Sequence, residues 1–139
     1  MFKALIILLC LTVLLKPIEI VVVADESFTE QNLSKKQIQD IFLNKKRFLN
    51  GQQILVMNYE SNHPLRICFQ KSILEKSVSS LEKYWRRAYY KGKKPPKVIK
   101  SVEMLLSFFQ TVQPSIGYMD INDSKKRNMK VLYREKCKE

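Results

Sequence analysis

The sequence predicts an α/β domain in which helices flank a central, mainly parallel sheet. Short apolar runs of strand length, rich in β-branched residues, alternate with segments of helical periodicity, and this alternation favours parallel strands joined by helical crossovers. The 139 residues are enough for one domain with a substantial core but not for two. The domain is expected over residues 18–139.

Residues 1–17 are of a different kind. Lys3 precedes the apolar run Ala4–Leu15, a pattern typical of a secretory signal. The run is shorter than the span of about 20 residues that crosses a bilayer. We therefore expect residues 1–17 to be a signal peptide or an uncleaved N-terminal anchor, and the protein to be exported.

The first strand is expected at Ile18–Ala24. Polar and apolar residues hardly alternate in this segment, so both faces of the strand should be buried. A helix should follow over Leu33–Asn44, because Ser34 and Gln37 have the spacing of a capping box. A turn around Asn50-Gly51 then leads to the next strand.

The second strand, Ile54–Met57, is followed by the polar loop Asn58–His63 and by a helix that begins at Pro64. Proline suits the first turn of a helix, where its missing N–H is not needed. One face of this helix is expected to be buried: Leu65, Cys68, Phe69 and Ile73.

Two further helices and two strands complete the prediction. The helices span Ser77–Lys91, with Ser79 and Glu82 as a capping box, and a segment capped by Ser101 that Pro114 ends. Residues 93–97, three lysines and the pair Pro95-Pro96, are expected to form an extended basic connector. Residues 120–128 should be a polar turn between two strands, residues 115–119 and 130–133. The first of these helices should bury one stripe: Leu81, Tyr84, Trp85, Ala88 and Tyr89.

Three cysteines do not make a disulfide framework. Cys10 lies in the expected signal, Cys68 is interpreted as a small core residue, and Cys137 lies in a charged tail. A Cys68–Cys137 bridge is the alternative for an exported protein. No spacing of histidine and cysteine predicts a metal site, and no cofactor is expected.

Three features occur in order along the chain: Ile41-Phe42-Leu43, Tyr84-Trp85 and Ile116-Gly117-Tyr118. In these features the sequence resembles the periplasmic phosphate-binding proteins, the substrate-binding subunits of ABC phosphate importers, and in particular their short single-lobe members. The resemblance implies a periplasmic location, one lobe of a type 2 periplasmic-binding-protein fold, a small oxyanion such as phosphate as ligand, and a transporter or sensor of the envelope as partner. The family's phosphate loop corresponds to Asn58–Pro64, which lacks that loop's glycines, threonine and leading arginine.

A strand end beside a helix N-terminus is a common anion site in α/β folds. We therefore predict an anion site at the residues Asn58, Ser61, Asn62, His63 and Arg66. Helix capping alone also accounts for Ser61 and Asn62. An ion pair with Glu60 is the alternative role for Arg66, and an exposed loop position the alternative for His63.

The formal net charge of +12 favours anionic partners. The first functional hypothesis is an exported, non-catalytic oxyanion-binding protein. The second is an envelope protein–protein interaction module that keeps the fold without binding phosphate. Nucleic-acid binding rests on charge alone and conflicts with export, and the sequence shows no paired carboxylates, activated nucleophile or metal cluster that would indicate an enzyme.

Overall fold

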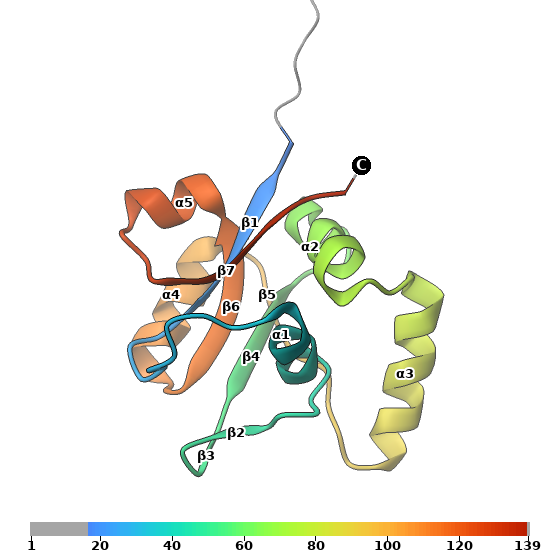
Figure 1. Ribbon diagram of the computed structural model, residues 1–139. Coiled ribbons are helices and arrows are strands. Elements are labelled where there is room, and N and C mark those ends of the chain that lie inside the picture. Colours follow the sequence, from blue (N-terminus) through green and yellow to red (C-terminus); the bar gives the residue numbers. More distant parts are fainter. Residues whose placement is uncertain (1–16, 139) are drawn as a thin grey trace, which may run out of the picture.

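The computed structural model describes residues 17–138, so the predicted signal or anchor lies outside the described residues except for Pro17. A five-stranded sheet with the order β5-β4-β6-β1-β7 forms the centre (Figure 1). The strands are β1 (Glu19–Ala24), β4 (Leu55–Tyr59), β5 (Lys97–Ile99), β6 (Ser115–Asp120) and β7 (Val131–Lys136). β4 pairs in parallel with β5 and β6, whereas β1 runs antiparallel to β6 and β7. Four strands thus share one direction, which confirms the α/β class and the mainly parallel sheet.

Helices cover both faces of this sheet. α1 (Lys35–Phe42) and α2 (Pro64–Phe69), which continues into a π-helical turn, η1 (Gln70–Leu74), pack on the face that carries Tyr118. α4 (Val102–Thr111) packs on the opposite face, where Leu105 fills the space over Gly117. α5 (Ile121–Lys126) lies beside α4, and α3 (Val78–Tyr90) stands at the side of the domain (Figure 1).

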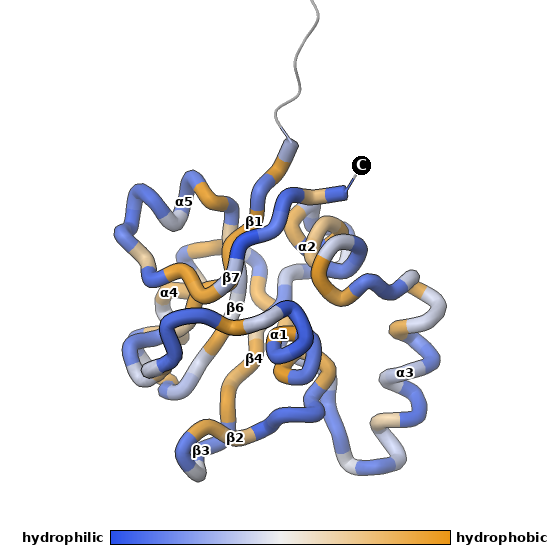
Figure 2. The backbone as a smooth tube through the Cα atoms, in the orientation of Figure 1, coloured by the Kyte–Doolittle hydropathy of each residue, from blue (hydrophilic) through white to orange (hydrophobic). Residues whose placement is uncertain are grey.

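The core is centred on β1. From Ile20 to Ala24 every residue of this strand is buried, as its unbroken apolar sequence predicted. Figure 2 shows hydrophobic residues concentrated in the strands and hydrophilic ones along much of α3. The predicted inner face of α2 and η1 is also confirmed, because Leu65, Cys68, Phe69 and Ile73 are all buried.

Two of the three predicted helix N-caps are confirmed, and the third is wrong. Ser34 and Gln37 form the predicted capping box of α1, and Ser101 caps α4. α3, however, is capped by Ser77, whose hydroxyl accepts from the Ser80 N–H, and not by Ser79. The buried stripe of α3 is also narrower than predicted, since Tyr89 is 73% exposed.

The sequence prediction missed four short elements. β5 was not predicted, and only its first residue, Lys97, lay in the expected basic connector. α5 was expected to be part of a polar turn. The predicted turn at Asn50-Gly51 is present, but it joins a small hairpin of β2 (Phe48–Leu49) and β3 (Gln52–Gln53). Asn50 and Gly51 both have positive φ, as such a tight hairpin requires.

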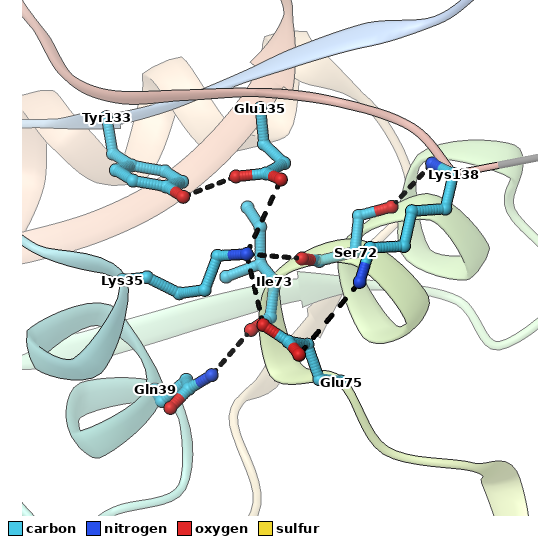
Figure 3. A network of polar contacts seen from close by, with 8 residues as sticks. All are labelled: Lys35, Gln39, Ser72, Ile73, Glu75, Tyr133, Glu135 and Lys138. Carbon is cyan, nitrogen blue, oxygen red and sulfur yellow. Dashed lines mark hydrogen bonds and ion pairs between the residues drawn. The ribbon is translucent and has the colours of Figure 1, made fainter.

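Cys68 and Cys137 form a disulfide, with their Cα atoms 5.2 Å apart. This corrects the interpretation of Cys68 as an unpaired core residue. The bond joins α2 to the end of the chain, which runs on from β7 past η1 (Figure 3). Strand pairing of β7 with β1 brings Cys137 to this position, which no local pattern in the sequence reveals.

Candidate functional site

The candidate site lies where β4, β5 and β6 end. β4 and β6 are neighbours in the sheet. After β4 the chain continues to β5 on one side of this pair, and after β6 it continues to β7 on the other side. In open α/β sheets, ligands bind in the crevice that such a switch point creates outside the carboxyl ends of the strands. The loop after β4, residues 60–63, and the first turn of α2 form one wall of this crevice.

Asn58 belongs to β4 and not to the loop in which it was predicted. It is buried, and its Oδ1 accepts a hydrogen bond from the Tyr118 hydroxyl. Its Nδ2 donates to no residue of the described part of the chain. The bond holds the amide in one orientation, with Nδ2 on the side away from Tyr118, and Asn58 lies at the edge of the crevice.

Arg66 is the principal cation of the site. Its Nη1 donates to the Tyr59 carbonyl oxygen at 2.8 Å, which holds the side chain against the end of β4. The alternative pairing with Glu60 does not form, and within residues 17–138 Arg66 makes no ion pair. A guanidinium in this state has the planar set of donors that suits bidentate hydrogen bonding to an oxyanion.

The other three predicted residues have different roles. Ser61 and Asn62 are exposed, and neither caps α2. His63 is the N-cap: its Nδ1 accepts from the Leu65 N–H at 3.1 Å, and its ring stacks on Tyr59 with centroids 4.5 Å apart. The alternative of an exposed loop histidine is therefore wrong, because capping and stacking hold the imidazole half-buried.

An aromatic cluster forms the floor under these polar groups. The rings of Phe69 and Tyr118 stack with centroids 4.1 Å apart, and Phe42 packs against both. Burial raises the pKa of both Tyr59 and Tyr118 above the ordinary value of 10.0. Both phenols therefore remain protonated at neutral pH, so Tyr118 continues to donate to Asn58, and Tyr59 to the Tyr118 carbonyl at 2.8 Å.

These residues open onto a groove of about 510 Å³ between α2, η1, α3 and β5. Asn58, Ser61 and Arg66 line it, so the structure brings three of the five predicted residues together. Asn62 lies with Ser61 and Arg66 on an adjoining shallow hollow, and His63 lines neither. The sequence prediction missed the wall that α3 forms. Leu81 and Trp85 line the groove on this side, whereas the prediction assigned both residues to the core.

A larger cavity, of about 780 Å³, lies toward the opposite end of the strands, between the end of β1 and α4. Its lining carries two carboxylates, Asp25 and Glu26, as well as Arg127 and Lys130. Asp25 accepts from Ser115 and from the Ser27 N–H, and Arg127 pairs with Asp123 and Glu103. The candidate anion site is therefore the groove beside β4, where neither Arg66 nor Arg86 has an acidic partner within residues 17–138.

No cluster of histidine, cysteine or acidic side chains that could hold a metal ion occurs among residues 17–138. No helix in that part of the chain is both long and apolar enough to span a bilayer.

The order and direction of the strands, together with the crevice at their carboxyl ends, define a single lobe of the periplasmic-binding-protein fold. A comparison with solved structures supports this assignment. An ABC-type phosphate transport receptor from Vibrio cholerae matches with a TM-score of 0.64 and 15% identity over 83% of this chain and 45% of the receptor. PstS from Borrelia burgdorferi matches with a TM-score of 0.61 and 12% identity over 83% of this chain and 46% of that protein.

A putative phosphate ABC transporter substrate-binding protein from Clostridium perfringens, solved with bound phosphate, matches with a TM-score of 0.60 and 16% identity. That match covers 86% of this chain and 53% of the other. The chain therefore spans about half the length of these proteins. No protein-family model matches the sequence, and no curated protein matches it. The resemblance predicted from sequence is thus confirmed for the fold.

Proposed function

We propose that the protein is an exported, non-catalytic oxyanion-binding protein, similar to the substrate-binding subunit of an ABC phosphate transporter. The observation that carries the proposal is the arrangement of Asn58, Ser61 and Arg66 on one groove, with no carboxylate of residues 17–138 paired to the arginine. Hydrogen bonds from a guanidinium to an oxyanion are among the strongest that proteins make. The solved structures with the same fold include a phosphate transport receptor and a substrate-binding protein with bound phosphate. Phosphate is therefore the ligand that we propose for this protein.

Two features support export. The apolar segment within residues 1–17 has the pattern of a signal peptide. The Cys68–Cys137 disulfide is of a kind that persists in the periplasm and is rare in the reducing cytosol. We propose the periplasm as the location and residues 18–139 as the mature domain.

Calorimetry of the purified protein with phosphate and with sulfate tests the binding proposal. Arg66→Gln should weaken phosphate binding by at least about tenfold, because a hydrogen bond to a charged group contributes about 1.5–3 kcal/mol. Arg87→Gln is the matched control, since Arg87 is exposed on α3 and does not line the groove. Absence of both heat and thermal stabilisation at millimolar anion would contradict the proposal.

The second candidate, an envelope interaction module, is favoured by the surface of α3 and its flanks. Residues 76–94 carry seven basic residues and one acidic residue, which amounts to half of the formal net charge of +12. None of the seven enters an ion pair within residues 17–138. Lys76, Lys83 and Arg87 also line a hollow of about 310 Å³ that contains no carboxylate. Such a surface suits an acidic protein face.

Charge reversal separates the two candidates. Lys83→Glu with Arg87→Glu should abolish salt-sensitive binding of polyglutamate and leave phosphate calorimetry unchanged, because neither residue lines the groove. Unchanged polyglutamate binding would exclude α3 as the contact surface.

A further inference from the structure

The groove extends well beyond the three polar residues that face its oxyanion end. Its volume of about 510 Å³ lies within the range of about 300–1,000 Å³ typical of pockets for drug-sized organic ligands. A phosphate ion has the bulk of only a few water molecules, each of which takes about 30 Å³ in the liquid. Inorganic phosphate would therefore occupy one end and leave most of the groove to solvent.

The remainder of the groove is mainly apolar. Leu74 from η1, Leu81 and Trp85 from α3, and Val98 from β5 line it. Leu74 and Leu81 are buried, Trp85 is half-buried, and Val98 remains 50% exposed. An apolar wall next to a cluster of polar donors matches the usual composition of organic-ligand sites, in which few polar groups fix orientation and apolar groups supply contact area.

Charge at the groove is also asymmetric. Arg66 lies at the oxyanion end, and Arg86 and Glu82 from α3 contribute one charge of each sign. Neither arginine is in an ion pair within the described residues. The cations thus outnumber the single carboxylate on the lining, which favours an anionic ligand over a neutral or cationic one.

We propose that the groove takes an amphipathic organic oxyanion, namely an organic phosphate whose head lies at Asn58, Ser61 and Arg66 and whose apolar body lies along Leu81 and Trp85. This inference rests on the oxyanion function proposed above and narrows its ligand class. The head group uses the polar donors, and the body displaces water from the apolar wall. Inorganic phosphate is then the weaker ligand.

Trp85 provides a direct measurement because it is the only tryptophan of the chain. Ethyl, butyl and hexyl phosphate are titrated into the full-length protein while tryptophan emission is followed. Affinity should rise by up to about fourfold for each added methylene, since burying a methylene contributes about 0.8 kcal/mol. Inorganic phosphate tests the contribution of the phosphate head alone, and hexanol tests that of the apolar body alone.

A pair of valine variants supplies the control. Val78→Thr keeps the side-chain shape but places a hydroxyl on the apolar wall, so it should weaken hexyl phosphate at least about threefold. It should leave inorganic phosphate unchanged, because Val78 lines the groove but not the hollow around Arg66. Val112→Thr should change neither, since Val112 lies at the end of α4 and does not line the groove.

The outcomes separate this inference from the proposed function. Equal affinities for inorganic and hexyl phosphate would overturn the organic-ligand inference and leave oxyanion binding intact. Hexanol binding as tightly as hexyl phosphate would show an apolar pocket without oxyanion recognition, which also overturns it. Failure of every phosphate to bind would overturn both proposals.

Discussion

The Tyr118 hydroxyl on β6 donates to the side-chain carbonyl of Asn58 on β4, joining two buried polar groups across neighbouring strands. Removing the donor with Tyr118→Phe leaves the Asn58 carbonyl oxygen unsatisfied. We expect the free energy of unfolding to fall by about 1–3 kcal/mol. Anion affinity should fall too, because the Asn58 amide would no longer be held with its donor end toward the groove. Urea denaturation and calorimetry measure the two effects.

Tyr133→Phe is the matched control for this prediction. The Tyr133 hydroxyl donates to Glu135, but both residues are only half-buried, so water can replace the lost bond. If the two phenylalanine variants lost equal stability, the buried bond between Tyr118 and Asn58 would have no special importance.

The Cys68–Cys137 disulfide closes a loop with a sequence separation of 69 residues. Such a link stabilises a fold mainly by restricting the unfolded chain, by about 2–4 kcal/mol. Cys137→Ala should therefore lower the urea midpoint, and a reducing agent should lower that of the wild type by a similar amount. The reductant should not affect the variant further. Equal stability of the oxidised and reduced wild type would contradict the prediction.

Gly117 allows close contact between β6 and α4. A Cβ at this position would lie 2.3 Å from Leu105 Cδ1, and Leu105 is fully buried. Gly117→Ala should thus destabilise the protein by about 1–3 kcal/mol through overpacking. In the double variant with Leu105→Ala, the added cost of the alanine at position 117 should largely disappear. Additive losses in thermal and urea unfolding would show that the two side chains do not compete for this space.

The parts of the fold that were predicted correctly have strong local signals. The unbroken apolar run of β1 predicted burial on both faces, and the spacing of Ser34 and Gln37 predicted the start of α1. β5 gives a weaker signal, because only its last residue, Ile99, is buried, Lys97 is its first residue and Lys100 follows it. Its strand conformation depends on pairing with β4, which is a tertiary effect.

The candidate site, too, was predicted where local sequence signals determine it and missed where tertiary contacts do. Its position after β4 followed from the strand, the polar loop and Pro64, and Asn58, Ser61 and Arg66 do line one groove. The partners that orient them could not be predicted, since Tyr118 lies 60 residues from Asn58. Trp85 was assigned to the core because helical periodicity identifies an apolar face without showing whether a groove lies beneath it.

Lys35 joins three segments that are distant in sequence (Figure 3). Its Nζ donates to the Ser72 carbonyl at 3.2 Å and pairs with Glu75 at 3.0 Å and with Glu135 at 3.4 Å. Burial acts to lower the pKa of Lys35, but the hydrogen bond to Glu75 and the charge of Glu135 more than offset it, so the pKa lies above 10.5. The same hydrogen bond, followed by the charges of Lys35 and Lys138, lowers the pKa of Glu75 below 4.5.

These shifts determine the pH range over which Lys35→Met should be less stable than the wild type. The Glu75 contribution is present above its unfolded pKa and is lost as pH falls through the lowered folded value. The Lys35 contribution is present below its unfolded pKa and is lost as pH rises through the raised folded value. The stability difference should therefore be greatest between about pH 5 and pH 10 and decrease on both sides. Lys36→Met, which removes only the exposed pair with Asp40, should cost less at neutral pH. Urea titrations from acid to alkaline pH measure both variants, and a difference that does not vary with pH would show that packing, rather than charge, makes Lys35 important.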